Sequence, residues 1–150
     1  MCPNHHQIDT EAITRFSCGV VSWAPRDATL QEYFDDYTAP LADVCCSCAS
    51  NISRKFSFVM HPPLLAVDLG ENKPYPNPVL TIKSGEVNRC YNPRGLIYFA
   101  ADHFMAHFIT QTGMVWFHDG IFTGRSLVYE GLLGTVPLGD AVTAIYARSP

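Results

Sequence analysis

Hydrophobic and polar residues alternate in short runs along much of the chain, and prolines or glycines bound these runs. Alternation with a period of two is typical of strands that bury one face. The first run extends from Ile13 to Trp23 and stops before Pro25. Later runs predict strands over Lys55 to Met60, Leu64 to Leu69 and Val79 to Ile82. These four runs are therefore predicted to be extended.

The most regular alternation lies between Gly95 and Gly131. Its runs are GLIYFA, FMAHFIT, MVWFHDG and SLVYEG, with the turn QTG between the second and third. Strands joined by such short turns pair as antiparallel hairpins, so this segment predicts a meander. A last run, AVTAIYAR from Ala141 to Arg148, predicts one further strand.

One segment has helical spacing instead. Thr29 and Glu32 form a capping-box pattern, and apolar or aromatic residues follow at helical intervals, which predicts a helix from Leu30 to Thr38 that Pro40 closes. The predicted fold class is α+β and rich in β structure: an antiparallel meander sheet with one or two short helices. With 150 residues, no repeat and no linker, residues 1–150 are predicted to form a single domain.

Composition and charge exclude several classes of protein. Hydrophobic residues make up 47% of the chain and charged residues 16%, which excludes a disordered tail. A net charge of −4 provides no broad basic face, so no nucleic acid partner is expected. No apolar run reaches the roughly 20 residues of a membrane span, and the N-terminus lacks a signal-peptide layout, so no membrane association is expected. We expect a cytoplasmic or nuclear protein whose six cysteines are reduced thiols.

A histidine and an aspartate fall at facing ends of the predicted meander. His103 begins the strand before the QTG turn, and Asp119 ends the strand after it. Antiparallel pairing brings the start of one strand beside the end of the next, so the two side chains should be neighbours. A carboxylate beside an imidazole orients it and stabilises its charged form, as catalysis by a thiol or hydroxyl requires. Surface residues at strand ends are the alternative interpretation of the same pattern.

The stretch DHFMAHF resembles the histidine box of ubiquitin-specific proteases, which are papain-like cysteine peptidases. His103, Phe104 and Ala106 match the box, Asp102 replaces a glycine, and His107 stands where an aromatic residue is usual. The following VWFHDG is similar to the family's strand that supplies the third catalytic residue. The resemblance leaves His118 or Asp119 for that role, and Asp119 is preferred because a carboxylate accepts the imidazole N–H.

The resemblance extends from about Thr29 to Arg148 and implies the fingers and palm portion of such a protease. It implies catalytic roles for His103 and Asp119, substrate contacts by Asp102 and Phe104, and ubiquitin or a ubiquitinated protein as partner. The family's helical thumb, with its cysteine box, has no counterpart in the sequence. We therefore expect deubiquitinase chemistry in a longer product and no activity of this chain alone, because no cysteine, including Cys18, lies in such a box.

Two other functions stay open: a non-catalytic scaffold module that binds ubiquitin or another protein, and a zinc-binding protein unrelated to ubiquitin. Cys45-x-x-Cys48 is half of a tetrahedral zinc site, but no second pair completes it, so no metal or other cofactor is expected. The aromatic residues of the meander either fill a core or line a groove for a peptide tail. Without a thumb, we expect a partly apolar exposed face or an oligomer. The five aromatic residues in question are Tyr98, Phe104, Phe108, Trp116 and Phe117.

Overall fold

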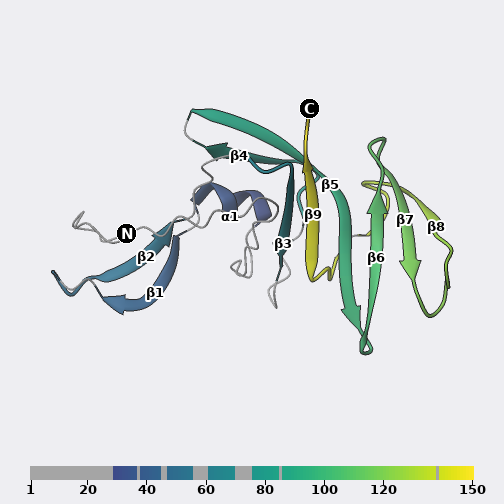
Figure 1. The fold of residues 1–150 in the computed structure, drawn as a ribbon, viewed down its shortest axis with the longest axis horizontal. Helices are drawn as coiled ribbons and strands as arrows, with labels where there is room; N and C mark the ends of the chain where they lie inside the picture. The colour runs from purple at the N-terminus through teal and green to yellow at the C-terminus, as the bar shows by residue number, and fades with distance from the viewer. Residues whose placement is uncertain are drawn as a thin grey trace.

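The computed structural model describes residues 29–36, 38–44, 47–55, 61–69, 76–84, 86–137 and 139–150. Within these ranges, one helix and nine strands follow one another along the chain (Figure 1). They are α1 (Leu30–Asp36), β1 (Thr38–Val44), β2 (Asn51–Lys55), β3 (Leu64–Asp68), β4 (Leu80–Ser84), β5 (Val87–Ala100), β6 (His103–Ile109), β7 (Met114–Asp119), β8 (Val128–Leu132) and β9 (Thr143–Arg148). The predicted β-rich α+β class is confirmed.

Helix α1 begins with the capping box that the sequence predicts. The Glu32 carboxylate accepts hydrogen bonds from the backbone N–H of Thr29 at 2.7 Å and from its hydroxyl at 2.9 Å, while the Thr29 hydroxyl accepts the Glu32 N–H at 3.2 Å. The predicted end is wrong. The helix stops at Asp36, and Thr38 and Pro40 already belong to strand β1, where Pro40 faces Ser53. Pairing with β2 overrides the local helical spacing there.

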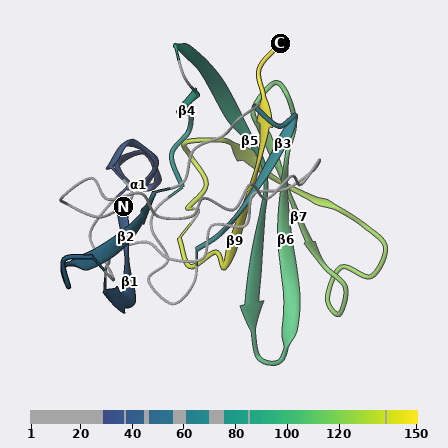
Figure 2. The same ribbon diagram turned by 60° about the vertical axis from the view of Figure 1, so that its left-hand side comes forward.

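The strands form two antiparallel sheets. β1 pairs only with β2, whereas the large sheet has the order β3-β9-β5-β6-β7-β8, with β4 on another part of β5. Figures 1 and 2 show the β1–β2 hairpin at the opposite side of the molecule from β6, β7 and β8. The C-terminal strand lies inside the sheet, between β3 and β5, which confirms the predicted last strand.

Strand β5 is much longer than predicted. It runs from Val87 to Ala100, and its first half pairs with β4 while its second half pairs with β6. The residues from Val87 to Cys90 are all exposed, so they show no apolar alternation from which a strand would be predicted. Pro93 is accommodated because the register with β9 shifts between Pro93 and Gly95.

The other predicted strands have three outcomes. Those over Leu64 to Leu69, Val79 to Ile82 and the meander are confirmed, with ends that differ by a few residues. Of the strand predicted from Lys55 to Met60, the structure describes only Lys55, which is the last residue of β2 (Asn51–Lys55). The segments Ile13–Trp23 and 56–60 lie outside the described residues.

The core forms on one face of the large sheet, and α1 packs onto it through Leu30. Because strand side chains alternate, His103, Met105, His107 and Ile109 of β6 share the face that carries the core, as the pairing of His107 with buried Leu96 shows. The buried hydrophobic residues are Leu30, Leu65, Val67, Leu69, Leu80, Ile82, Tyr91, Leu96, Ile109, Val115, Val136, Ala141, Ala144 and Tyr146.

The opposite face of the meander is exposed and apolar. Phe104 and Phe108 of β6 face water, so the interpretation that they fill a core is wrong. Phe104 instead packs against Phe99 of β5, with tilted rings whose centroids are 4.8 Å apart. The expected partly apolar surface is therefore present. Among the described residues, no helix is long and apolar enough to cross a membrane.

Candidate functional site

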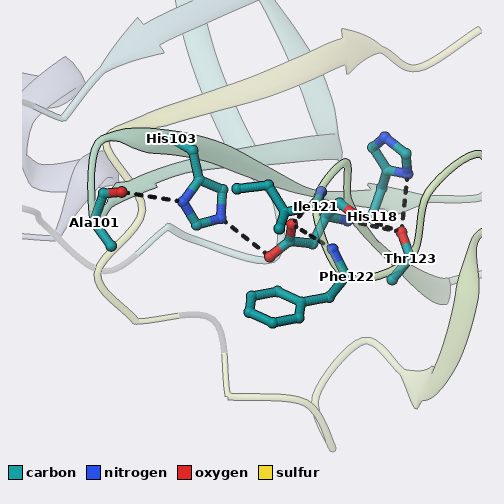
Figure 3. A network of polar contacts seen from close by, with 7 residues as sticks. Ala101, His103, His118, Ile121, Phe122 and Thr123 are labelled. Atoms are coloured by element: carbon teal, nitrogen blue, oxygen red, sulfur yellow. Dashed lines mark hydrogen bonds and ion pairs between the residues drawn. The ribbon is translucent and has the colours of Figure 1, made fainter.

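The hairpin of β6 and β7 brings His103 and Asp119 together. Its turn closes with hydrogen bonds between Thr110 and both Gly113 and Met114, and Gly113 takes the positive φ of 82° that glycine adopts without strain. The register pairs Met105 with Asp119, two positions from His103. His103 Nε2 lies 3.1 Å from Asp119 Oδ2 (Figure 3). The predicted juxtaposition is confirmed; the catalytic roles stay a prediction.

The Asp119 carboxylate is fixed from both sides. Its side chain is 2% exposed. While Oδ2 faces the imidazole, Oδ1 accepts the backbone N–H of Ile121 at 2.8 Å and that of Phe122 at 3.2 Å. The turn after β7 is thus built around the same carboxylate that holds His103, and this arrangement leaves the imidazole little freedom to rotate.

The second ring nitrogen of His103 is less tightly held. Since an ionised carboxylate only accepts hydrogen bonds, His103 Nε2 carries a hydrogen and donates it to Asp119. In the neutral imidazole, Nδ1 is then the basic nitrogen. It lies 3.4 Å from the Ala101 carbonyl oxygen, and the histidine side chain is 21% exposed. The arrangement provides a base, Nδ1, and a group that orients it.

The two groups shift each other's pKa. The hydrogen bond to Asp119, supported by the Ala101 carbonyl, raises the pKa of His103 against the effect of desolvation. Burial raises the pKa of Asp119, but hydrogen bonds from His103, Ile121 and Phe122 outweigh it, so the pKa of this carboxyl is lowered overall. Together the shifts favour an imidazolium–carboxylate pair over a wider pH range than isolated groups would allow.

The shifts predict how stability depends on pH. A raised histidine pKa stabilises the fold below its ordinary value of 6.5, and this contribution is lost as pH rises through the folded-state pKa. A lowered aspartate pKa stabilises the fold above 3.8 and is lost as pH falls through the folded-state pKa. The difference in melting temperature between the protein and His103→Gln should therefore be largest between about pH 4 and 6.5. A difference that is constant from pH 3 to 9 would contradict the pair.

His118 does not contact His103. Its Nδ1 lies 3.2 Å from the Ser126 carbonyl oxygen and 3.4 Å from the Thr123 hydroxyl, and alternation along β7 places it on the face opposite to Asp119. Of the two candidates for the residue that orients the imidazole, the structure therefore brings Asp119, and not His118, to His103.

Asp102 and Phe104 flank His103 without contacting the pair. Asp102 is exposed in the tight turn between β5 and β6, where it and Ala101 have positive φ angles of 62° and 48°. Phe104 is exposed on the other face of β6. Their roles in binding substrate stay predictions, and a substrate that meets Phe104 would have to reach around the edge of this hairpin.

A second polar network was not predicted. His107, which is buried, lies 2.9 Å from the Tyr98 hydroxyl through Nδ1 and 2.8 Å from Glu130 through Nε2. Glu130 reaches it from β8 across the intervening strand β7, because the register of β7 and β8 shifts between Val115 and Trp116. The one signal in the sequence was His107 itself, a polar residue where the resembled box has an aromatic one.

No thiol is placed at His103 by the described residues. Cys90 lies on β5 ten residues before Ala100, which pairs with His103, so about 30 Å of strand separate them. Cys48 lies in the connection between β1 and β2, the hairpin that Figure 1 shows on the opposite side of the molecule from β6. Cys45, the other half of the Cys-x-x-Cys pair, and Cys18 lie outside the described residues. The part of the chain that the structure describes contains no group of three or more potential metal ligands.

Comparison with known proteins gives a structural likeness only. No protein-family model and no curated protein matches the chain. A chain of the yeast SAGA DUB module with an Sgf73 mutant is similar over 99% of this chain, with a TM-score of 0.72 and 14% identity. The module of Ubp8, Sgf11, Sus1 and Sgf73 bound to monoubiquitin gives 0.68 and 14%, and its complex with ubiquitin aldehyde gives 0.66 and 12%, both over 99% of this chain.

The TM-scores show a shared fold, and at 12–14% identity they show the fold alone. The present chain spans 39% of the length of the chains it matches. Its fold is therefore like that of part of the ubiquitin-specific protease in this module.

Proposed function

We propose that this chain is a ubiquitin-specific-protease-like domain that binds ubiquitin and supplies the histidine and the orienting carboxylate of a cysteine-type deubiquitinase site. The observation that carries the proposal is the 3.1 Å contact of His103 with the buried Asp119, which leaves Nδ1 as the base. The fold shared with part of the SAGA DUB module chain supports it. From about residue 29 onward, the chain would correspond to the fingers and palm portion.

The chemistry would follow from this geometry. His103 Nδ1 takes the proton of a cysteine thiol, and the thiolate attacks the carbonyl carbon at the end of ubiquitin. The carbon–nitrogen bond breaks, and the leaving amine takes the proton from Nδ1. Water then attacks the thioester carbon and gives a proton to the same nitrogen. The carbon–sulfur bond breaks, the sulfur takes that proton from Nδ1, and ubiquitin leaves as a carboxylate whose acid proton passes to water. Throughout, Asp119 accepts the Nε2–H and stabilises the imidazolium.

The thiol would come from outside the described residues. Both described cysteines are too remote from His103 in the fold to donate a proton to it. The remaining four cysteines do not resemble the family's cysteine box. We therefore propose that the chain alone binds ubiquitin without hydrolysing its conjugates, and that a longer product carries the complete Cys–His–Asp site.

Two measurements on the full chain test this function. Titration of the isotope-labelled protein with monoubiquitin should shift the amide signals of residues around His103, and a ubiquitin probe with a thiol-reactive C-terminus should label no cysteine. His103→Gln and the matched His118→Gln, on the opposite face of the hairpin, show whether the shifts belong to this site. Absence of shifts at millimolar ubiquitin would overturn the binding role. Stoichiometric labelling of one cysteine would overturn the proposed lack of a nucleophile.

A scaffold role without catalysis is the second candidate, and the exposed apolar face of the meander favours it. In that case the chain would bind ubiquitin or another protein and hydrolyse nothing. In a longer product, His103→Gln would then leave any rate of ubiquitin hydrolysis unchanged. A zinc protein unrelated to ubiquitin would contain one zinc ion after gentle purification and would unfold with a chelator. A metal-free protein with an unchanged melting temperature would reject that function.

A further inference from the structure

The turn after β7 exposes two large apolar side chains beside the histidine pair. Ile121 is 68% exposed and Phe122 is 82% exposed, the two highest values among the large hydrophobic side chains of the described residues. Figure 3 shows both residues close to His103, and the backbone N–H groups of both donate to the Asp119 carboxylate. Contact of apolar surface with water is unfavourable, and neighbouring exposed apolar side chains are typical of a surface that binds a partner.

The same turn is held in place by hydrogen bonds. Asp119 Oδ1 accepts both backbone N–H groups of the two exposed residues. The Thr123 N–H and hydroxyl both donate to the Asp119 carbonyl oxygen at 2.7 Å, and the Thr123 hydroxyl accepts the Asp119 N–H at 3.1 Å. The two side chains are thus presented on a preorganised backbone, so that a partner would meet them with little loss of conformational entropy.

We propose that Ile121 and Phe122 form an apolar contact site for ubiquitin next to the scissile bond, an inference that rests on the proposed function. For His103 Nδ1 to serve a thiol, the attacked carbonyl carbon must lie within roughly 3–3.5 Å of that thiol. The imidazole lies between the two sites, with Nδ1 at one end of the ring and Asp119, to which the turn is bonded, at the other, and we place the part of ubiquitin near this carbonyl against the turn. Asp119 would couple two functions, because one oxygen orients the base and the other positions the apolar contact.

Binding of monoubiquitin to single variants of the full chain tests this site. Phe122→Ser and Ile121→Ser should each weaken binding about tenfold, which corresponds to about 1.4 kcal/mol. Phe122→Leu, which keeps an apolar side chain, should retain most of the affinity. Phe108→Ser is the matched control, because this phenylalanine is also exposed but lies on the opposite face of the sheet. In all four variants the pKa of His103 should be unchanged, which shows that the turn is intact.

Each outcome decides between the proposals. If the unmodified chain binds ubiquitin and the serine variants at Ile121 and Phe122 bind it equally well, the contact site is wrong and the proposed function stands. If Phe108→Ser weakens binding as strongly as Phe122→Ser, ubiquitin meets the other face and the site is also wrong. If the unmodified chain binds no ubiquitin, both the contact site and the proposed function fail.

Discussion

Asp119→Asn is expected to move the proton of neutral His103 from Nε2 to Nδ1. The amide oxygen would continue to accept the hydrogen bonds from the backbone N–H groups of Ile121 and Phe122. The flipped orientation is unfavourable because it would place the NH₂ group against these two donors. The amide nitrogen would then face His103 at the position of Oδ2, and it can only donate. The imidazole would accept at Nε2 and carry its hydrogen on Nδ1, where the Ala101 carbonyl stabilises it. A base whose reactive nitrogen already holds a proton takes none from a thiol.

Nitrogen chemical shifts of the imidazole distinguish the two tautomers directly. The variant should also lose the elevation of the His103 pKa, because both the hydrogen bond and the charge of Asp119 contribute to it. His118 is the internal control, since it contacts Ser126 and Thr123 and should keep its tautomer. In any catalytically complete product, the same change should lower the rate of ubiquitin hydrolysis by about 10²–10⁴-fold. An unchanged His103 tautomer would show that the bond to Asp119 does not form in solution.

The hairpin that carries the pair was predictable because two local signals agree on it. Apolar alternation sets the faces of β6 and β7, and the QTG turn sets their register. The proximity of His103 and Asp119 could therefore be predicted from the local sequence alone. The preference for Asp119 over His118 rested on the chemistry of the acceptor. Alternation along β7 agrees with it, since adjacent residues of a strand face opposite ways.

The features that were missed depend on non-local pairing. Nothing near Glu130 in the sequence indicates the register shift that brings it across β7 to His107. The first half of β5 is extended because β4 pairs with it, and its exposed residues carry no period. The helix end was misplaced for the same reason, since β2 recruits Thr38 and Pro40 into a strand. Alternation also predicts two faces without saying which is covered, and so it could not decide whether Phe104 and Phe108 fill a core or face water.

Tyr146→Ala is expected to lower the free energy of unfolding by about 3–5 kcal/mol, the range for truncating a large buried aromatic side chain. Tyr146 has no exposed surface and lies on β9, opposite Leu65 on one side and Pro93 on the other. Its hydroxyl donates to the Asn77 carbonyl oxygen at 3.0 Å, and the Asn77 side chain in turn accepts the Gln31 N–H of helix α1. One side chain therefore joins three strands of the large sheet to the segment that holds the helix.

Tyr146→Phe separates packing from the hydrogen bond. This variant keeps the ring but removes the hydrogen bond to the Asn77 carbonyl oxygen. It should therefore lower the free energy of unfolding by only about 1 kcal/mol. Tyr129→Ala removes an exposed ring and should cost less than about 1 kcal/mol. Urea unfolding followed by tryptophan fluorescence measures all three. Equal losses for Tyr146→Ala and Tyr129→Ala would mean that β9 is not the centre of the core. If only Tyr146→Ala lowers stability strongly, then packing around β9 stabilises the sheet that contains β6 and β7, the two strands that carry His103 and Asp119.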